Sequence, residues 1–228
     1  MKVPRSWPFR CSAVLSLLLL AAAVVLAGPP LICHSFDIGS ARCLPWISHS
    51  WNLSGSENYD TSKLASDTVA ILAADNTVIV HMETLRRATL YARKDPAAAK
   101  ALFNSIALGT KSPQPDQSRA LKYFDTGYLA EAYKQWLGDS SNNPAAGIDG
   151  YELIKEAIRL RGNDPQMELA AALVTQSRPG SEHQAHAQKA IAGAKGDPLL
   201  ARNLASHFIG NDGQTIAELL TKSTVAER

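Results

Sequence analysis

The sequence contains none of the common catalytic or nucleotide-binding motifs: its 228 residues include no G-x-S-x-G, no P-loop and no dinucleotide-binding fingerprint. It also lacks a basic stripe. The formal net charge is +2, but without Lys2, Arg5 and Arg10 near the N-terminus, 20 basic side chains face 21 acidic ones. A near-neutral body argues against nucleic-acid binding. We therefore predict no nucleic-acid partner, and we assign no catalytic, metal-binding or cofactor-binding residue.

Charged residues are absent from Cys11–Ala27, a mostly apolar run of 17 residues that follows a basic start. Residues 1–27 thus have the layout of a secretory signal, with a small-residue cleavage site at Val25-Leu26-Ala27. An uncleaved anchor is the alternative, because 17 residues is the lower limit for crossing a bilayer. A lipid-modified Cys33 is a third reading. All three predict an exported protein, periplasmic, extracellular or anchored facing outward, whose membrane contact would be limited to residues 11–27 if they are uncleaved.

Cysteine is scarce. Of the 3 cysteines, only Cys33 and Cys43 lie outside the signal, in a Pro-, Gly- and Ser-containing segment over residues 28–59 that we expect to be irregular and to use its tryptophans as anchors. In an oxidising compartment two nearby cysteines most simply form a disulfide, so we predict a bridge between them. A metal or redox site using Cys33, His34, Cys43 and His49 is the alternative, although its spacing matches no standard zinc pattern. Free thiols are the third possibility.

Strand-like alternation is absent from the second half of the chain, and helical periodicity takes its place. The strongest local signal is an Asp-Pro pair that opens a helix. Aspartate caps a helix N-terminus, and proline suits the first helical position because its missing N–H is not needed there. Cations before each pair complement the end of the preceding helix. The signal occurs three times and predicts helix caps at Asp95, Asp164 and Asp197.

Residues 60–228 are therefore predicted to form an all-α domain of about nine helices packed as helical hairpins. The helix over about residues 77–94 is apolar on more than one side and should be sandwiched, with His81 as a hydrogen-bonded core histidine and Arg86 and Arg87 on a solvated face. One long helix is expected to run through Gly127. The pair His183 and His186 is interpreted as exposed, since no third metal ligand accompanies it.

The 33-residue step from Pro165 to Pro198, with alanines between paired helices, is similar to tetratricopeptide-type repeats. The similarity covers residues 77–107 and 150–222, and the signature Trp-Leu-Gly-Tyr set is not recognisable. It implies an α-solenoid that binds a protein or peptide partner. It transfers no functional residue to this chain.

Three functions follow from these patterns. The leading one is an exported, non-catalytic helical-repeat protein that binds a protein or peptide partner in the cell envelope. The second is a structural envelope protein held by its N-terminal segment. The third is a metal- or thiol-dependent enzyme using Cys33 and His34 or His183 and His186.

Overall fold

The computed structural model describes residues 30–47, 53, 55–108, 116–138, 141–177 and 181–209. Within them the chain is all-α, as predicted, and no strand occurs in these ranges. The expected last helix, Gln214–Lys222, and the predicted signal over residues 1–27 lie outside the described residues. The eight α-helices are α2 Leu64–Ala74, α3 Val78–Ala92, α4 Pro96–Leu108, α5 Asp116–Leu137, α6 Gly150–Arg161, α7 Pro165–Thr175, α8 Glu182–Gly193 and α9 Pro198–Leu204. Short 3-10 turns at Thr61–Lys63 and Ala194–Gly196 and a π-helical turn, η4, at Ala205–Ile209 complete the list.

The three Asp-Pro pairs open α4, α7 and α9: each proline is the first residue of its helix, and each aspartate comes directly before it. The Asp164 carboxylate accepts hydrogen bonds from the N–H groups of Gln166 and Met167, and Asp197 accepts one from Leu200. Asp95 accepts from the N–H groups of the second and third residues of α4. These bonds satisfy donors that the first turn of a helix leaves unpaired.

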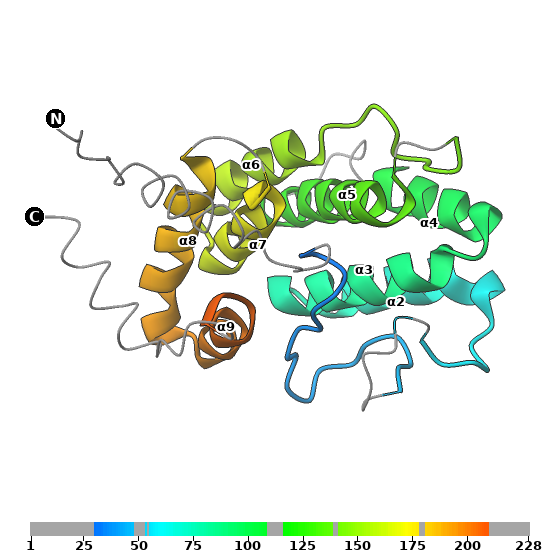
Figure 1. Cartoon of the computed structure of the whole chain (residues 1–228), viewed down its shortest axis with the longest axis horizontal. Helices are drawn as coiled ribbons and strands as arrows, with labels where there is room; N and C mark the ends of the chain where they lie inside the picture. The colour runs from blue at the N-terminus through cyan, green and yellow to red at the C-terminus, as the bar shows by residue number, and fades with distance from the viewer. Residues whose placement is uncertain are drawn as a thin grey trace, which may run out of the picture.

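The helices pack on one another in the order of the chain, as expected for an array of helical hairpins. Each helix contacts the next one along the chain, and α2 also contacts α4, α3 contacts α5, α5 contacts α7 and α7 contacts α9. Helix α3 lies at the centre, in contact with α2, α4, α5 and α7, and all its residues except Arg87 are buried. The prediction that this helix is sandwiched is confirmed (Figure 1).

Helix α5 runs unbroken through Gly127, as predicted, and this glycine lies against α6. A Cβ atom built on Gly127 would lie 2.5 Å from the backbone oxygen of Gly150, and one built on Gly150 would lie 2.3 Å from the oxygen of Gly127. No larger residue fits either position without moving a backbone. The two glycines therefore set how closely α5 and α6 approach.

Residues 30–47, called here the N-terminal segment, contain no regular helix or strand but lie along α3 and next to α9 (Figure 1). Four of its side chains belong to the hydrophobic core: Leu31 and Ile32 are fully buried, Leu44 is 1% exposed and Phe36 is 3% exposed. The expected irregular segment is thus an integral part of the fold. Among the described helices, none is both long and apolar enough to cross a membrane.

Candidate functional site

The N-terminal segment is held mainly through its backbone, by polar side chains of α3, α5 and α9. We call the set Glu83, Arg86, Arg87, Tyr91, Gln135, Arg202 and Asn203 the segment-binding face. Its members come from three helices that are far apart in the sequence. The site is therefore built by the tertiary fold rather than by a local motif.

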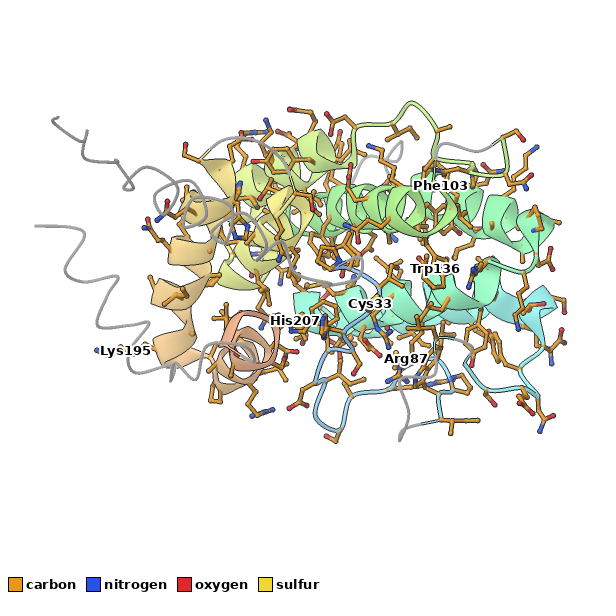
Figure 2. The ribbon with its side chains drawn as sticks, in the orientation of Figure 1. Cys33, Arg87, Phe103, Trp136, Lys195 and His207 are labelled. Carbon is orange, nitrogen blue, oxygen red and sulfur yellow. The ribbon has the colours of Figure 1, made fainter. Side chains whose placement is uncertain are left out.

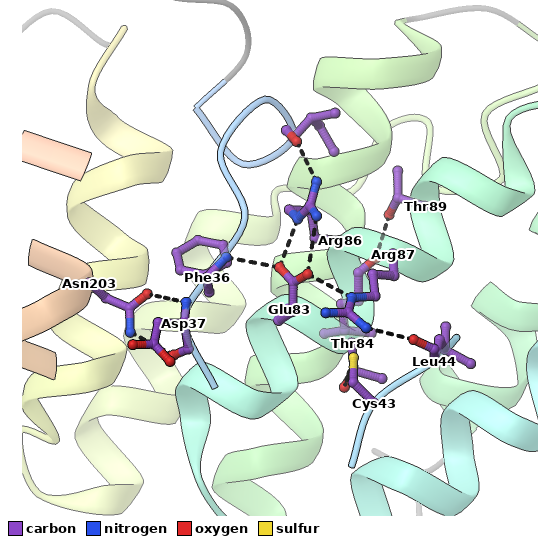
Figure 3. A network of polar contacts seen from close by, with 12 residues as sticks. Phe36, Asp37, Cys43, Leu44, Glu83, Thr84, Arg86, Arg87, Thr89 and Asn203 are labelled. Atoms are coloured by element: carbon purple, nitrogen blue, oxygen red, sulfur yellow. Dashed lines mark hydrogen bonds and ion pairs between the residues drawn. The ribbon is translucent and has the colours of Figure 1, made fainter. Parts of the chain in front are cut away.

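Glu83 is the centre of this face. Its carboxylate is fully buried, and it accepts hydrogen bonds from Arg86 Nε at 2.7 Å, from Arg87 Nε at 2.7 Å and from the Phe36 N–H at 3.0 Å. A lone buried carboxylate would be strongly unfavourable, and two guanidinium groups compensate it. One turn of α3 thus holds one negative and two positive charges on a helix that is otherwise largely apolar (Figure 3).

The two arginines use their remaining N–H groups on the segment's carbonyls. Arg86 Nη1 donates to the Ile32 oxygen at 2.9 Å, and Arg87 Nη1 donates to the Leu44 oxygen at 2.6 Å. Both guanidinium groups also lie over the Trp46 ring, at 5.3 and 5.8 Å from its centroid. Trp46 is therefore an anchor, as predicted, whereas Trp51, the other expected anchor, lies outside the described residues. The expectation that Arg86 and Arg87 form a solvated face is wrong, because Arg86 is only 2% exposed and Arg87 18%.

Asn203 on α9 holds the middle of the segment with both ends of its amide. Its Oδ1 accepts from the Asp37 N–H at 2.9 Å, and its Nδ2 donates to the Asp37 carbonyl at 2.8 Å. Arg202 adds an ion pair to the Asp37 carboxylate at 2.6 Å. Hydrogen bonds from the Gly39 N–H and from Arg202 lower the pKa of Asp37, so this carboxylate is ionised at neutral pH.

The ends of the segment are fixed in the same way. The Leu31 N–H donates to Gln135 Oε1 at 2.9 Å, and the Tyr91 hydroxyl donates to the Pro45 carbonyl. The same hydroxyl accepts the N–H of Ser56 at 2.8 Å. At three places, residues 31–32, 36–37 and 44–45, the segment presents backbone groups to side chains of the helices, while its buried apolar side chains enter the core.

The π-helical turn places His207 against the segment (Figure 2). Its ring stacks on Phe36, with centroids 4.4 Å apart and planes 13° apart, and its Nδ1 lies 2.8 Å from the Asn203 carbonyl. Burial lowers the pKa of His207 to about 4, so the ring is neutral at pH 7.

The predicted disulfide is not formed in this structure, since Cys33 and Cys43 are both free thiols. The carbonyls of Ile32 and Leu44, next to the two cysteines, accept hydrogen bonds from Arg86 and Arg87. Successive side chains of a helix point about 100° apart around its axis, so the two arginines hold the two cysteine regions at different positions around α3. Cys43 Sγ lies 3.4 Å from the Thr84 hydroxyl. Burial raises the pKa of both thiols, which argues against an activated nucleophile.

The alternative metal site is not assembled in the part of the chain that the structure describes. No group of three or more His, Cys, Asp or Glu side chains able to hold a metal ion is found there. His49, the fourth residue of that proposed set, lies outside the described residues.

His183 and His186 are not exposed as expected, because both bond to the neighbouring helix. His183 Nδ1 bonds to the Ala172 carbonyl at 2.7 Å. His186 lies between the fully buried Glu168 carboxylate, bonded through Nδ1, and the Tyr151 hydroxyl, 2.7 Å from Nε2. The order Tyr-His-Glu resembles a catalytic relay, but Tyr151 is only 2% exposed, so its oxygen cannot reach a substrate. The three side chains tie α6, α7 and α8 together.

His81 is a hydrogen-bonded core histidine, as predicted. Its Nδ1 bonds to Asp125 at 2.6 Å and its Nε2 to the Asp75 carbonyl at 2.8 Å. Burial alone would lower the pKa of His81, but the charge and hydrogen bond of Asp125 outweigh burial and raise it. Both ring nitrogens are used, so this histidine has no capacity left for catalysis.

Comparison with protein-family models, with curated proteins and with solved structures finds no match to this chain. The tetratricopeptide-type resemblance thus adds nothing to the site, and the contacts of the N-terminal segment carry the functional inference.

Proposed function

We propose that this chain is an exported, non-catalytic helical scaffold that binds an extended peptide segment across α3, α5 and α9, and that residues 30–47 occupy this site in cis. One observation carries the proposal: the segment-binding face bonds to backbone groups. The N–H groups of Leu31, Phe36 and Asp37 are bound, as are the carbonyls of Ile32, Asp37, Leu44 and Pro45. Backbone groups are common to all peptides, so the same face can hold a segment of another protein.

A catalytic alternative has less support. Burial raises the pKa of the two thiols, the Tyr151–His186–Glu168 row is inaccessible at its tyrosine, and His81 is fully engaged. An enzyme needs a reactive group that a substrate can reach. The polar groups of the face are instead arranged for binding.

The binding proposal is tested on the full chain with a specific protease site inserted after Ser50. After folding, the chain is cut under native conditions and its fragments are separated by gel filtration. We expect the N-terminal fragment to stay with the body and to exchange with an excess of a fluorescent peptide of residues 30–47, followed by anisotropy, with thiols kept reduced. Loss of the fragment with no rebinding of the peptide would rule the proposal out.

The variant that should weaken binding in that experiment is Asn203→Ala in the same cut protein, and Lys155→Ala is its control. Asn203→Ala removes two hydrogen bonds to the Asp37 backbone while leaving the apolar contacts in place. At about 1 kcal/mol for each bond, the peptide should bind about 30-fold more weakly. Lys155→Ala, on exposed helix surface of α6, should leave the affinity unchanged.

Export is proposed from the basic start and the uncharged run Cys11–Ala27. A reporter fused after Arg228, of a kind that is active only outside the cytosol, should be active. Activity of a cytosol-specific reporter in the same fusion would count against export.

A second candidate is a structural envelope protein, because the first contact of the N-terminal segment with the helical body lies close to the uncharged run Cys11–Ala27. Leu31, fully buried and bonded to Gln135, comes four residues after Ala27. Four residues span at most about 14 Å. If the run stays in a membrane, the body is held directly against it. Mature protein that keeps residues 1–27 in membrane fractions would favour this function, and a cleaved N-terminus would exclude it.

A further inference from the structure

The segment-binding face does more than hold a backbone, because it receives particular side chains at a particular spacing. Leu31 and Ile32 are fully buried, and Phe36, four residues after Ile32, is 3% exposed. Ser35 between them is exposed. A ligand is therefore selected for two adjacent aliphatic residues and for an aromatic residue four positions after the second.

The residue after the aromatic is selected by charge. Arg202 pairs with the Asp37 carboxylate at 2.6 Å, while Asn203 fixes the backbone of the same residue at both its N–H and its carbonyl. Because the amide pair fixes this residue in place, the guanidinium meets a side chain at one defined position. An aspartate there satisfies it.

Residues 30–47 leave one polar group next to them without a partner. His207 Nε2 is buried and has no hydrogen-bond partner among the described residues, and the His207 ring stacks on Phe36 of the segment. A buried polar group without a partner is unfavourable. A segment that bonds to this nitrogen would therefore bind more tightly than the one in place.

We propose that the face binds an extended segment of a partner protein, and that residues 30–47 compete with this ligand from within the chain. The ligand carries two adjacent aliphatic residues and, four residues after the second, an aromatic residue followed by aspartate. The inference rests on the proposed peptide-binding function. Residues 30–47 are joined to the body by a short connector, so their effective concentration is in the millimolar range. The intact chain therefore resists a free peptide that the cut chain accepts.

The test uses the intact chain and the chain cut after Ser50, each titrated with the fluorescent peptide of residues 30–47 under reducing conditions. The cut chain should bind at least about 100-fold more tightly than the intact chain, since the tethered copy no longer competes at millimolar concentration. Equal affinity for both chains would overturn the competition.

Peptide variants then test the pattern on the cut chain. Deleting Ser35 shortens the spacing by one residue and should weaken binding by about 100-fold or more, as should Phe36→Ala, because a buried aromatic leaves its site. Ser35→Ala is the matched control and should change the affinity less than about twofold. If the parent peptide binds but the deletion and Phe36→Ala bind as well as it does, the pattern fails while the peptide-binding function stands. If the parent peptide does not bind, both fail.

A double-mutant cycle tests the aspartate. The peptide variant Asp37→Ala and the protein variant Arg202→Ala should each weaken binding by about two- to fivefold, and the combination should be no weaker than either alone. Additive losses would remove the acidic residue from the pattern. Native mass spectrometry of the intact chain should show a monomer, and a dimer that disappears on cutting would assign the face to a second copy of the chain instead.

Discussion

Two glutamates, Glu83 on α3 and Glu168 on α7, are both fully buried and both paired, but their partners differ in kind. Glu83 is held by the guanidinium groups of Arg86 and Arg87, which are 2% and 18% exposed. Glu168 is held by His186 and by Lys189, whose side chain is 55% exposed. Burial would raise the pKa of Glu168, but the hydrogen bonds from His186 and Lys189 outweigh burial and lower it.

The comparison separates two uses of a buried carboxylate. The Glu83 group joins α3 to a segment about fifty residues earlier in the sequence, and its surplus positive charge faces backbone carbonyls of that segment. The Glu168 group joins neighbouring helices, and its Lys189 partner is 55% exposed to solvent. We infer that the Glu83 group is the stronger of the two ties and the Glu168 group the weaker.

The largest expected effect is that of Glu83→Ala. It leaves Arg86, at 2% exposure, without its carboxylate, and loss of one partner of a buried pair costs about 3–5 kcal/mol of the free energy of unfolding. Chemical denaturation measures this. The control is Glu156→Ala, whose pair with Arg159 is exposed and whose loss should change stability by less than about 0.5 kcal/mol. Equal effects of the two variants would mean that the buried Glu83 pair contributes no more to stability than an exposed ion pair.

The second expectation is a pH dependence of the free energy of unfolding caused by His207, which lies next to the N-terminal segment. The unfolded chain protonates histidine near pH 6.5, whereas folded His207 protonates only near pH 4. Between these values the unfolded state binds a proton that the folded state excludes, so stability falls as the pH falls, by on the order of 3 kcal/mol in total. Denaturation at several pH values between 7 and 4 measures the slope.

His207→Gln serves as the control, because it removes this group and leaves the remaining titrations in place. His81, with its raised pKa, acts with the opposite sign: its contribution is present below pH 6.5 and is lost as the pH rises through its folded value. The difference between the variant and the parent chain isolates His207. If the two chains had the same pH profile, the histidine next to the segment would carry no pH dependence.

A smaller effect is expected for Glu168→Gln. The amide still accepts a hydrogen bond but loses the charge that pairs with His186 and Lys189, so we expect a loss of about 1–3 kcal/mol in the free energy of unfolding. The pKa of Glu168 is lowered by folding, so its contribution is present above its ordinary pKa and disappears as the pH falls through the folded value. A loss as large as that of Glu83→Ala would contradict the ranking of the two ties.

The smallest effect is expected for Arg202→Ala. Its ion pair with Asp37 is about half exposed on both sides, 53% and 45%, and exposed pairs contribute about 0.2–1 kcal/mol. Thermal melts should show little change, whereas Leu204→Ala, two positions on and 1% exposed, should cost about 2–5 kcal/mol. Similar melts for the two variants would mean that α9 packs through a different face.

The helices could be predicted from sequence because their signals are local. The aspartates before α4, α7 and α9 act within three residues, and the apolar positions on both sides of Gly127 keep one helical phase. The N-terminal segment could not, because its partners Glu83 and Asn203 lie 47 and 166 residues away. Its irregular composition says nothing about such distant contacts.

One signal for the segment-binding face was present but misinterpreted. Glu83, Arg86 and Arg87 lie three and four residues apart on a helix that is apolar on more than one side. Charges at that spacing on a sandwiched helix have to compensate one another and leave donors for other partners. His183 and His186 were misjudged for a related reason: a helix start suggests exposure, but α8 packs its first turns on α7.

The Tyr91 hydroxyl donates to the carbonyl of Pro45 and accepts the N–H of Ser56, which flank the connector over residues 48–55. Because one side chain holds both flanks, the cost of lengthening the connector is one of chain entropy. Doubling the length of a closed loop costs only about 0.6 kcal/mol. An insertion after Ser50, between the core contacts of Trp46 and Leu53, should therefore change the stability of the fold by less than about 1 kcal/mol.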